Sequence, residues 1–136
     1  MKVEYVSTSF IHQQWEQVEP YLRAAFENPE ASGEITIGQL RADLGQNRAA
    51  LYKAIEGDEV IGAAAVTFQN QRNARVAFVL AIGGRWIAKP DGYAQFVALL
   101  KAAGATRIAG AGRDSTVRLW ARFGLKKKYT VFEAAI

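Results

Sequence analysis

The chain has 136 residues, half of them hydrophobic, which is enough for one domain with a single core and too few for two. It has no cysteine and one histidine, His12, so disulfides, thiolate nucleophiles and cysteine-ligated metals are excluded, and we expect no metal site and no histidine-based triad. No apolar stretch approaches the roughly 20 residues of a membrane span, and the N-terminus lacks the long apolar run of a secretory signal. We therefore expect one cytoplasmic domain over residues 1–136.

The net charge of +4 is concentrated in one part of the chain. Residues 102–136 hold seven Lys or Arg residues and two acidic ones, so the rest of the chain is slightly negative. Such a patch favours contact with the phosphates of a cofactor, with nucleic acid or with an acidic partner. The alternative is a solvated face with cations near a helix C-terminus.

The first quarter of the chain predicts a strand and a helix. The alternating run at 3–7 is typical of a strand. Ser9 is then placed to cap a helix, and Pro20 is expected to kink or split that helix near Glu19 without abolishing it. The apolar positions of this helix, at spacings of three and four, are Ile11, Trp15, Val18, Leu22, Ala25 and Phe26.

A polar segment at 27–34, with Pro and Gly, indicates a loop. Thr36 stands three residues before Gln39, the spacing of a capping box, and predicts a second helix over roughly 37–47. Two apolar runs joined by "EGDE" then indicate a hairpin, and a third follows the polar turn at 69–73. We interpret the three runs as an antiparallel meander with at least one strand buried on both faces.

The stretch "AIGGRWIAKPDGY" at 81–93 leads from the third strand into a helix that is expected to stop at Gly104. A strand at 106–111, a helix capped by Ser115 or Asp114, and a final strand in "KKYTVFEAA" complete the chain. The predicted order is β-α-α-β-β-β-α-β-α-β.

This order, with the stretch "STVRLWARFGLKKKYTVFE", resembles the GNAT superfamily of N-acetyltransferases. That stretch is similar to the family's final helix and strand, N-x-x-A-x-x-L-Y-x-x-x-G-F, with Leu119, Gly124 and Leu125 in corresponding places. The chain looks most like short GNAT-like proteins of bacteriophages and prophages, in which a Trp-containing first helix ("WEQVEPYLRAAFE" here) precedes the meander. The resemblance implies an α/β (α+β) fold, with a mixed, mostly antiparallel sheet of about six strands flanked by about four helices.

The resemblance also implies a site for acetyl-CoA between the ends of strands 74–82 and 106–111, with the pyrophosphate on the loop "IGGRWIAKPDG" and the next helix start. The implied cofactor-binding residues are Ile82, Gly83, Gly84, Arg85, Lys89, Arg118 and Arg122. The family's loop, Q/R-x-x-G-x-G/A, is not matched. Gly83 and Gly84, which are adjacent, could form either a phosphate-binding loop or a purely structural turn, and the sequence leaves both interpretations open.

Asp91 is expected to be the N-cap of the helix after this loop, where its carboxylate would occupy N–H groups and repel a phosphate. Arg85 and Lys89 would offset that repulsion. Amide formation also needs proton transfers. The family often uses a Tyr acid where this chain has Trp120, and no Asp, Glu or His lies between Val60 and Pro90.

Tyr129 is our candidate catalytic residue, with Tyr93 as a substitute and a core position as the alternative for either. Transfer by proximity alone is the other route. Arg118 and Arg122 share a helix face with Lys126, which fits a 3′-phosphate, nucleic acid or an acidic partner. We do not expect nucleic acid, because the aromatic residues are interpreted as core.

Two functions stay open. One is an N-acetyltransferase acting on an amine. The other is an inert GNAT-fold phage protein, in the cytoplasm of a bacterial host or associated with the virion, that serves as a structural or assembly component, binds a phage protein or inhibits a host protein, with a homo-oligomer as one form.

Overall fold

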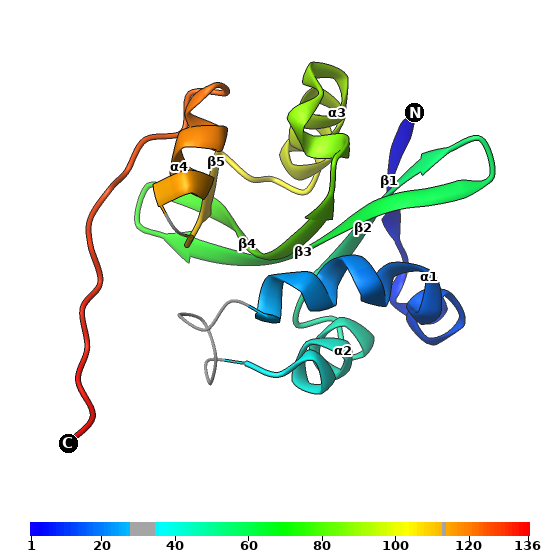
Figure 1. The fold of residues 1–136 in the computed structure, drawn as a ribbon, viewed down its shortest axis with the longest axis horizontal. Coiled ribbons are helices and arrows are strands. Elements are labelled where there is room, and N and C mark those ends of the chain that lie inside the picture. Colours follow the sequence, from blue (N-terminus) through cyan, green and yellow to red (C-terminus); the bar gives the residue numbers. More distant parts are fainter. Residues whose placement is uncertain (28–34, 113) are drawn as a thin grey trace.

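The computed structural model describes residues 1–27, 35–112 and 114–136, so most of the predicted loop at 27–34 lies outside the described residues. One sheet lies between two pairs of helices, with α1 and α2 on one face and α3 and α4 on the other (Figure 1). The strands are β1 (Lys2–Val6), β2 (Ala50–Glu56), β3 (Glu59–Gln71), β4 (Ala74–Gly84) and β5 (Arg107–Gly110). The α-helices are α1 (Ile11–Ala24), α2 (Ile37–Gly45), α3 (Pro90–Ala102) and α4 (Asp114–Ala121). Short 3-10 turns lie at Thr8–Phe10, Ala25–Glu27 and Trp86–Ala88.

The sheet has the order β1-β2-β3-β4-β5, with antiparallel pairing except between β4 and β5, which are parallel. The predicted meander is confirmed. Its central strand β3 is buried on both faces from Gly62 to Val66, as expected. Three consecutive alanines there, Ala63–Ala65, leave room for helices to approach the sheet from either side.

Each face of the sheet has its own hydrophobic cluster. The α1 and α2 face is filled by aliphatic side chains that are fully buried, among them Val18, Leu22 and Leu40. The cluster on the other face includes large aromatic side chains, among them Trp86 and Phe96, beside smaller aliphatic ones. The mixed α+β class and the four helices are therefore confirmed.

The start of α1 differs from the prediction. Ser9 does not cap it, because the N-cap of α1 is Phe10, which makes no side-chain cap hydrogen bond. Ser7 caps the 3-10 turn before the helix, where its hydroxyl accepts a hydrogen bond from the Ser9 N–H. Pro20 lies inside α1 and does not split it. The proline removes one backbone donor, and the buried apolar face of the helix holds the turns on either side together.

The start of α2 agrees with the prediction. Thr36 and Gln39 form the capping box, with the Gln39 N–H on the Thr36 hydroxyl at 3.1 Å and the Thr36 N–H on the Gln39 side chain at 2.8 Å. The helix ends at Gly45, two residues earlier than predicted, and Asn47 follows with a φ of 60°.

The predicted final strand is wrong, and the sheet has five strands instead of about six. Residues 125–136 run away from the body as an extended segment without a paired strand (Figure 1). Phe132 and Val131 in this segment are 92% and 77% exposed. The alternating apolar pattern favours an extended backbone, but a strand also needs a neighbour to take its hydrogen bonds. The helix before it begins at Asp114, so Asp114 and Ser115 lie in α4 and not before it.

Candidate functional site

Strands β4 and β5 part halfway along β4. Their parallel pairing runs from Val76 opposite Arg107 to Val79 opposite Gly110, while β4 continues to Gly84. A bulge lies at the same place, because the register of β4 on β3 jumps from Val79 to Ala81. The pairing stops at Gly110 because β5 ends there, and the bulge bends β4 and increases its local twist just beyond the last pair. The carboxyl ends of these two strands are where the resemblance predicts an acetyl-CoA site.

The adjacent glycines at the end of β4 are explained by close packing. A Cβ on Gly83 would lie 2.1 Å from the carbonyl oxygen of Tyr21, in α1. Gly84 has a φ of 92°, and a Cβ there would lie 2.4 Å from the carbonyl oxygen of Ile61. Both positions therefore need glycine for the fold itself, which favours the structural-turn interpretation.

Trp86 anchors the loop after these glycines, a role that sequence reasoning missed. Its side chain is 1% exposed, its Nε1–H donates to the Gly83 carbonyl at 2.9 Å, and its ring packs edge-on against Phe96 at 5.5 Å. A Cβ on Gly62 would lie 2.0 Å from the indole, so that glycine makes room for the ring. The signal in the sequence that could have predicted this role is the large apolar Trp86 directly after Gly83, Gly84 and Arg85.

Asp91 is not the N-cap of α3, so that prediction is wrong. Lys89 is the N-cap, Pro90 is the first helical residue, and no side chain caps this end. Proline suits the first helical position, so Asp91 is the second helical residue, two positions past the N-cap. Its carboxylate accepts from the Gln95 Nε2 at 2.9 Å. The N–H groups of the first turn are thus left without a side-chain cap, with one negative charge beside them.

Three aromatic side chains bridge α3 and α4. Tyr93 stacks on Phe123 with ring centroids 4.2 Å apart and planes 10° apart, and meets the buried Trp120 edge-on at 6.2 Å. Burial raises the pKa of the Tyr93 hydroxyl above its usual value of 10.0, which favours the neutral phenol. Nearby, an Nη2–H of Arg122 donates to the Ala88 carbonyl at 3.4 Å. The end of α4 is therefore held against the loop and the start of α3.

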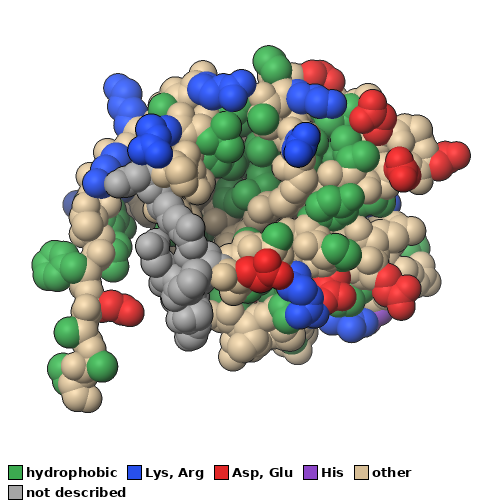
Figure 2. All heavy atoms as spheres, viewed as in Figure 1, with side chains coloured by type: hydrophobic (Ala, Val, Ile, Leu, Met, Phe, Trp, Pro, Cys, Tyr) green, Lys and Arg blue, Asp and Glu red, His purple; other side chains and the backbone are tan. Residues whose placement is uncertain are grey.

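The structure brings some of the predicted site residues together. Arg122 reaches the loop that carries Arg85 and Lys89, both of which are exposed, and Ile82 to Gly84 end the neighbouring strand. Arg118 is exposed, one helical turn before Arg122. Tyr129 lies apart on the extended segment and is 71% exposed, with the Lys128 Nζ 5.8 Å from its ring centroid. Figure 2 shows Lys and Arg side chains gathered around α4 and the start of this segment.

No group of three His, Cys, Asp or Glu residues that could hold a metal ion occurs in residues 1–27, 35–112 and 114–136. Across the same residues, no helix has the length and apolar character needed to cross a membrane.

A mixed sheet whose parallel pair parts beyond a bulge, with helices on both faces, is the fold of the GNAT acetyltransferases. One similar solved structure is that of a probable acetyltransferase, with a TM-score of 0.68, 11% identity, and coverage of 100% of this chain and 98% of that one. An aminoglycoside acetyltransferase from an uncultured soil metagenomic sample, in complex with trehalose, has a TM-score of 0.67 and 15% identity, with coverage of 99% and 95%. A predicted acetyltransferase from Clostridium acetobutylicum, solved with acetyl-CoA, has a TM-score of 0.61 and 14% identity, with coverage of 98% and 95%.

No protein-family model and no curated protein matches the sequence. At these identities the likeness shows the fold, and the chemistry has to be argued from the residues of the site.

Proposed function

We propose that this protein binds acetyl-CoA where β4 and β5 part, and transfers the acetyl group to an amine. The observation that carries the proposal is the end of the β4–β5 pairing at Val79 and Gly110, at the bulge in β4. The fold is shared with acetyltransferases, one of them solved with acetyl-CoA. Bound acetyl-CoA supplies the acetyl group as a thioester.

The residues at the start of α3 fit a pyrophosphate. The N–H groups of Asp91 and Gly92 lie in the first turn, where no intrahelical acceptor exists for them and no side chain caps them. Three cationic residues lie in or against the segment before this turn: Arg85 and Lys89 are exposed in the loop, and Arg122 contacts the loop at the Ala88 carbonyl. Their charges outnumber the single carboxylate of Asp91.

Few side chains near the proposed site can transfer a proton. Catalysis would therefore depend mainly on how the amine and the thioester are positioned. Trp120 is buried and its indole N–H does not ionise near neutral pH. Tyr129, the candidate catalytic residue, lies apart from the strand ends, 71% exposed on the extended segment, so the amine loses its proton to water and the departing thiolate takes one from water. We expect a slow transferase that acts by holding an amine next to the thioester.

The second candidate is an inert GNAT-fold phage protein that contacts a virion, assembly or host protein. Two observations favour it. The stacked Tyr93 and Phe123 rings join α3 to α4 beside the implied acetyl-CoA site. The extended segment exposes the side chains of Tyr129, Val131 and Phe132. Exposed apolar side chains in one segment are typical of a protein contact.

Calorimetric titration with acetyl-CoA separates the two candidates. Binding in the micromolar range supports the transferase, and the absence of binding at about 1 mM acetyl-CoA rules it out. Arg122→Gln should weaken binding, because it removes a cation from the loop. The matched control is Arg107→Gln, an exposed arginine at the opposite, amino end of the β4–β5 pair, which should leave the affinity unchanged.

A further inference from the structure

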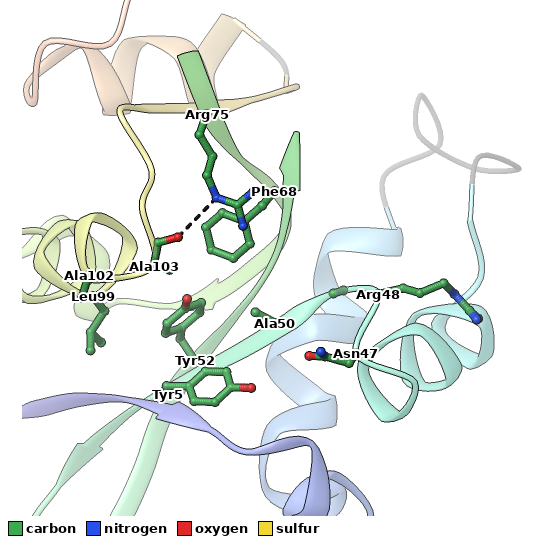
Figure 3. A pocket seen from close by; sticks show the side chains of 11 residues that line it. Tyr5, Asn47, Arg48, Ala50, Tyr52, Phe68, Arg75, Leu99, Ala102 and Ala103 are labelled. Atoms are coloured by element: carbon green, nitrogen blue, oxygen red, sulfur yellow. Dashed lines mark hydrogen bonds between the residues drawn. The ribbon is translucent and has the colours of Figure 1, made fainter. Parts of the chain in front are cut away.

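A cavity of about 550 Å³ lies between the sheet and the C-terminal end of α3 (Figure 3). Its walls come from β1 to β4, from the turn after α2 and from the end of α3. They are Tyr5, Asn47, Arg48, Ala49, Ala50, Tyr52, Phe68, Arg75, Leu99, Ala102 and Ala103. The volume is in the range of small-molecule sites.

This cavity is separate from the proposed acetyl-CoA site. Arg75 lies at the amino end of β4 and Gly84 at its carboxyl end, nine residues further on, which is roughly 30 Å at about 3.3 Å per residue. Ala103 likewise follows the last turn of α3, whereas the candidate phosphate site is at its first turn. A ligand in the cavity would leave the other site free.

Tyr52 places an unused hydroxyl in the cavity. Its side chain is 3% exposed, and the hydroxyl points toward Ala103 and Arg75 (Figure 3). No hydrogen bond of this hydroxyl occurs among the described residues, and the hydroxyl is not one of their fully buried unpaired atoms, so its oxygen is accessible from the cavity. Burial and the neighbouring Tyr5 raise the pKa of Tyr52 to about 12, so the group is a neutral donor at physiological pH. It therefore suits an acceptor on a ligand.

Arg75 adds a positive charge that no carboxylate neutralises among the described residues. Its Nε–H donates to the Ala103 carbonyl at 3.2 Å and an Nη1–H to the Asn70 side chain at 2.9 Å, which leaves three of its five N–H groups. Arg48 differs, because it forms an ion pair with Asp43 at 2.8 Å. Among the residues that the structure describes, no Asp or Glu lines the cavity. The net field in the cavity therefore favours an anion.

Apart from Asn47 and Arg48, the remaining walls are alanine, leucine and aromatic side chains. The Arg75 guanidinium lies over the Phe68 ring at 4.7 Å, and Leu99 and the Tyr52 ring complete the surface below it. Aromatic walls of this kind fit an aromatic ring, which stacks or packs edge-on. One cation and one phenol donor match the two oxygens of a single carboxylate better than a multiply charged phosphate.

We propose that this cavity binds a small aromatic carboxylate, with the carboxylate on Arg75 and the Tyr52 hydroxyl and the ring against Phe68 and Leu99. Binding is independent of acetyl-CoA, because the two sites lie at opposite ends of β4. The proposal does not depend on the transferase activity.

The test is calorimetric titration of the full chain with 2-naphthoate, and with the uncharged 2-naphthamide as the matched probe. We expect 2-naphthoate to bind at least about tenfold more tightly, since a charge-assisted hydrogen bond is the stronger kind. No binding at about 10 mM 2-naphthoate, or equal affinity for the two probes, would overturn the proposal.

Three variants locate the binding. Tyr52→Phe removes one hydroxyl and keeps the ring, and should weaken 2-naphthoate binding about three- to tenfold. Arg75→Gln should weaken it about tenfold or more. Arg48→Gln is the control, because that arginine is already paired with Asp43, and its effect should be less than about twofold. If neither Tyr52→Phe nor Arg75→Gln changes the affinity, 2-naphthoate binds elsewhere and the assignment of this cavity is wrong.

Discussion

The two ends of β4 differ in how their polar groups and their space are used. At the carboxyl end, Gly83 and Gly84 touch neighbouring backbone and Trp86 fills the remaining volume, with its N–H on a backbone carbonyl. At the amino end, a cavity of about 550 Å³ remains, where within the described part of the chain the Tyr52 hydroxyl makes no hydrogen bond and no carboxylate pairs with Arg75. The glycine pair first drew attention to the carboxyl end, yet the amino end has more unused binding capacity.

The difference shows that glycines in a strand-to-helix loop have to be judged by what a side chain would meet there. An adjacent pair can serve a phosphate or a tight contact, and both uses need small residues. The contacts with the Tyr21 and Ile61 carbonyls account for this pair. The end of the β4–β5 pairing and the uncapped first turn of α3 still favour acetyl-CoA.

The largest expected effect tests the tight packing at the carboxyl end. Gly83→Ala should destabilise the protein by about 3 kcal/mol or more, because the new methyl would overlap the Tyr21 carbonyl and neither backbone can move freely. Gly83 does not have a positive φ, so the cost is steric. Urea unfolding monitored by circular dichroism measures the change in free energy.

The matched control for this variant is Gly38→Ala. Gly38 lies in α2, and its nearest neighbour for a new Cβ is the Thr36 hydroxyl at 3.8 Å, so alanine should stabilise the helix by about 0.5–1 kcal/mol. If Gly83→Ala changed stability by as little as the control does, the packing explanation of the glycine pair would be wrong.

The next largest effect is a loss of folding stability at alkaline pH, caused by Tyr52 at the amino end of β4. The pKa of Tyr52 in the folded protein is about 12, above the usual value of 10.0, so ionisation favours the unfolded chain. The stability that this group contributes is complete below about pH 10 and is lost as the pH rises toward 12. Urea unfolding at several pH values should show this loss in the unmodified protein and a smaller loss in Tyr52→Phe. Equal pH profiles for the two proteins would show that Tyr52 ionises as readily when folded as when unfolded.

A smaller conformational effect is expected at the end of α3, beside the cavity. Gly104 has a φ of 92°, and its N–H and that of Ala105 close the helix by donating to the Lys101 and Leu100 carbonyls. Gly104→Ala should cost about 1–2 kcal/mol through backbone strain alone, because the nearest atom to a new Cβ is the Arg75 Cδ at 3.5 Å. Unfolding by urea again measures it. A cost as large as that of Gly83→Ala would mean that the two ends are equally tightly packed.

Much of the fold could be predicted from local signals. The Thr36 capping box, the stop at Gly104 and the meander each depend on residues close together in the chain, and all three were confirmed. The final strand failed because pairing is a long-range property that "KKYTVFEAA" does not encode by itself. The prediction that Asp91 is the N-cap of α3 was wrong, because Pro90 is also suited to a helix start and is the first helical residue.

The site was less predictable. That Arg122 meets the loop depends on how α4 packs beside α3, and that Tyr52 and Arg75 share a cavity depends on the register of three strands. Neither relation leaves a local pattern in the sequence.

The smallest expected effect decides whether the carboxyl end binds a phosphate at all. Asp91→Asn removes the one negative charge in the first turn of α3 and keeps an oxygen that can accept from Gln95. If the pyrophosphate lies there, acetyl-CoA should bind about two- to fivefold more tightly, the size of a charge effect at an exposed helix N-terminus. Asp58→Asn, in the exposed β2–β3 turn, is the control and should change nothing. Unchanged or weaker binding by Asp91→Asn would place any bound cofactor away from this helix start, and the carboxyl end would then have a packing role alone.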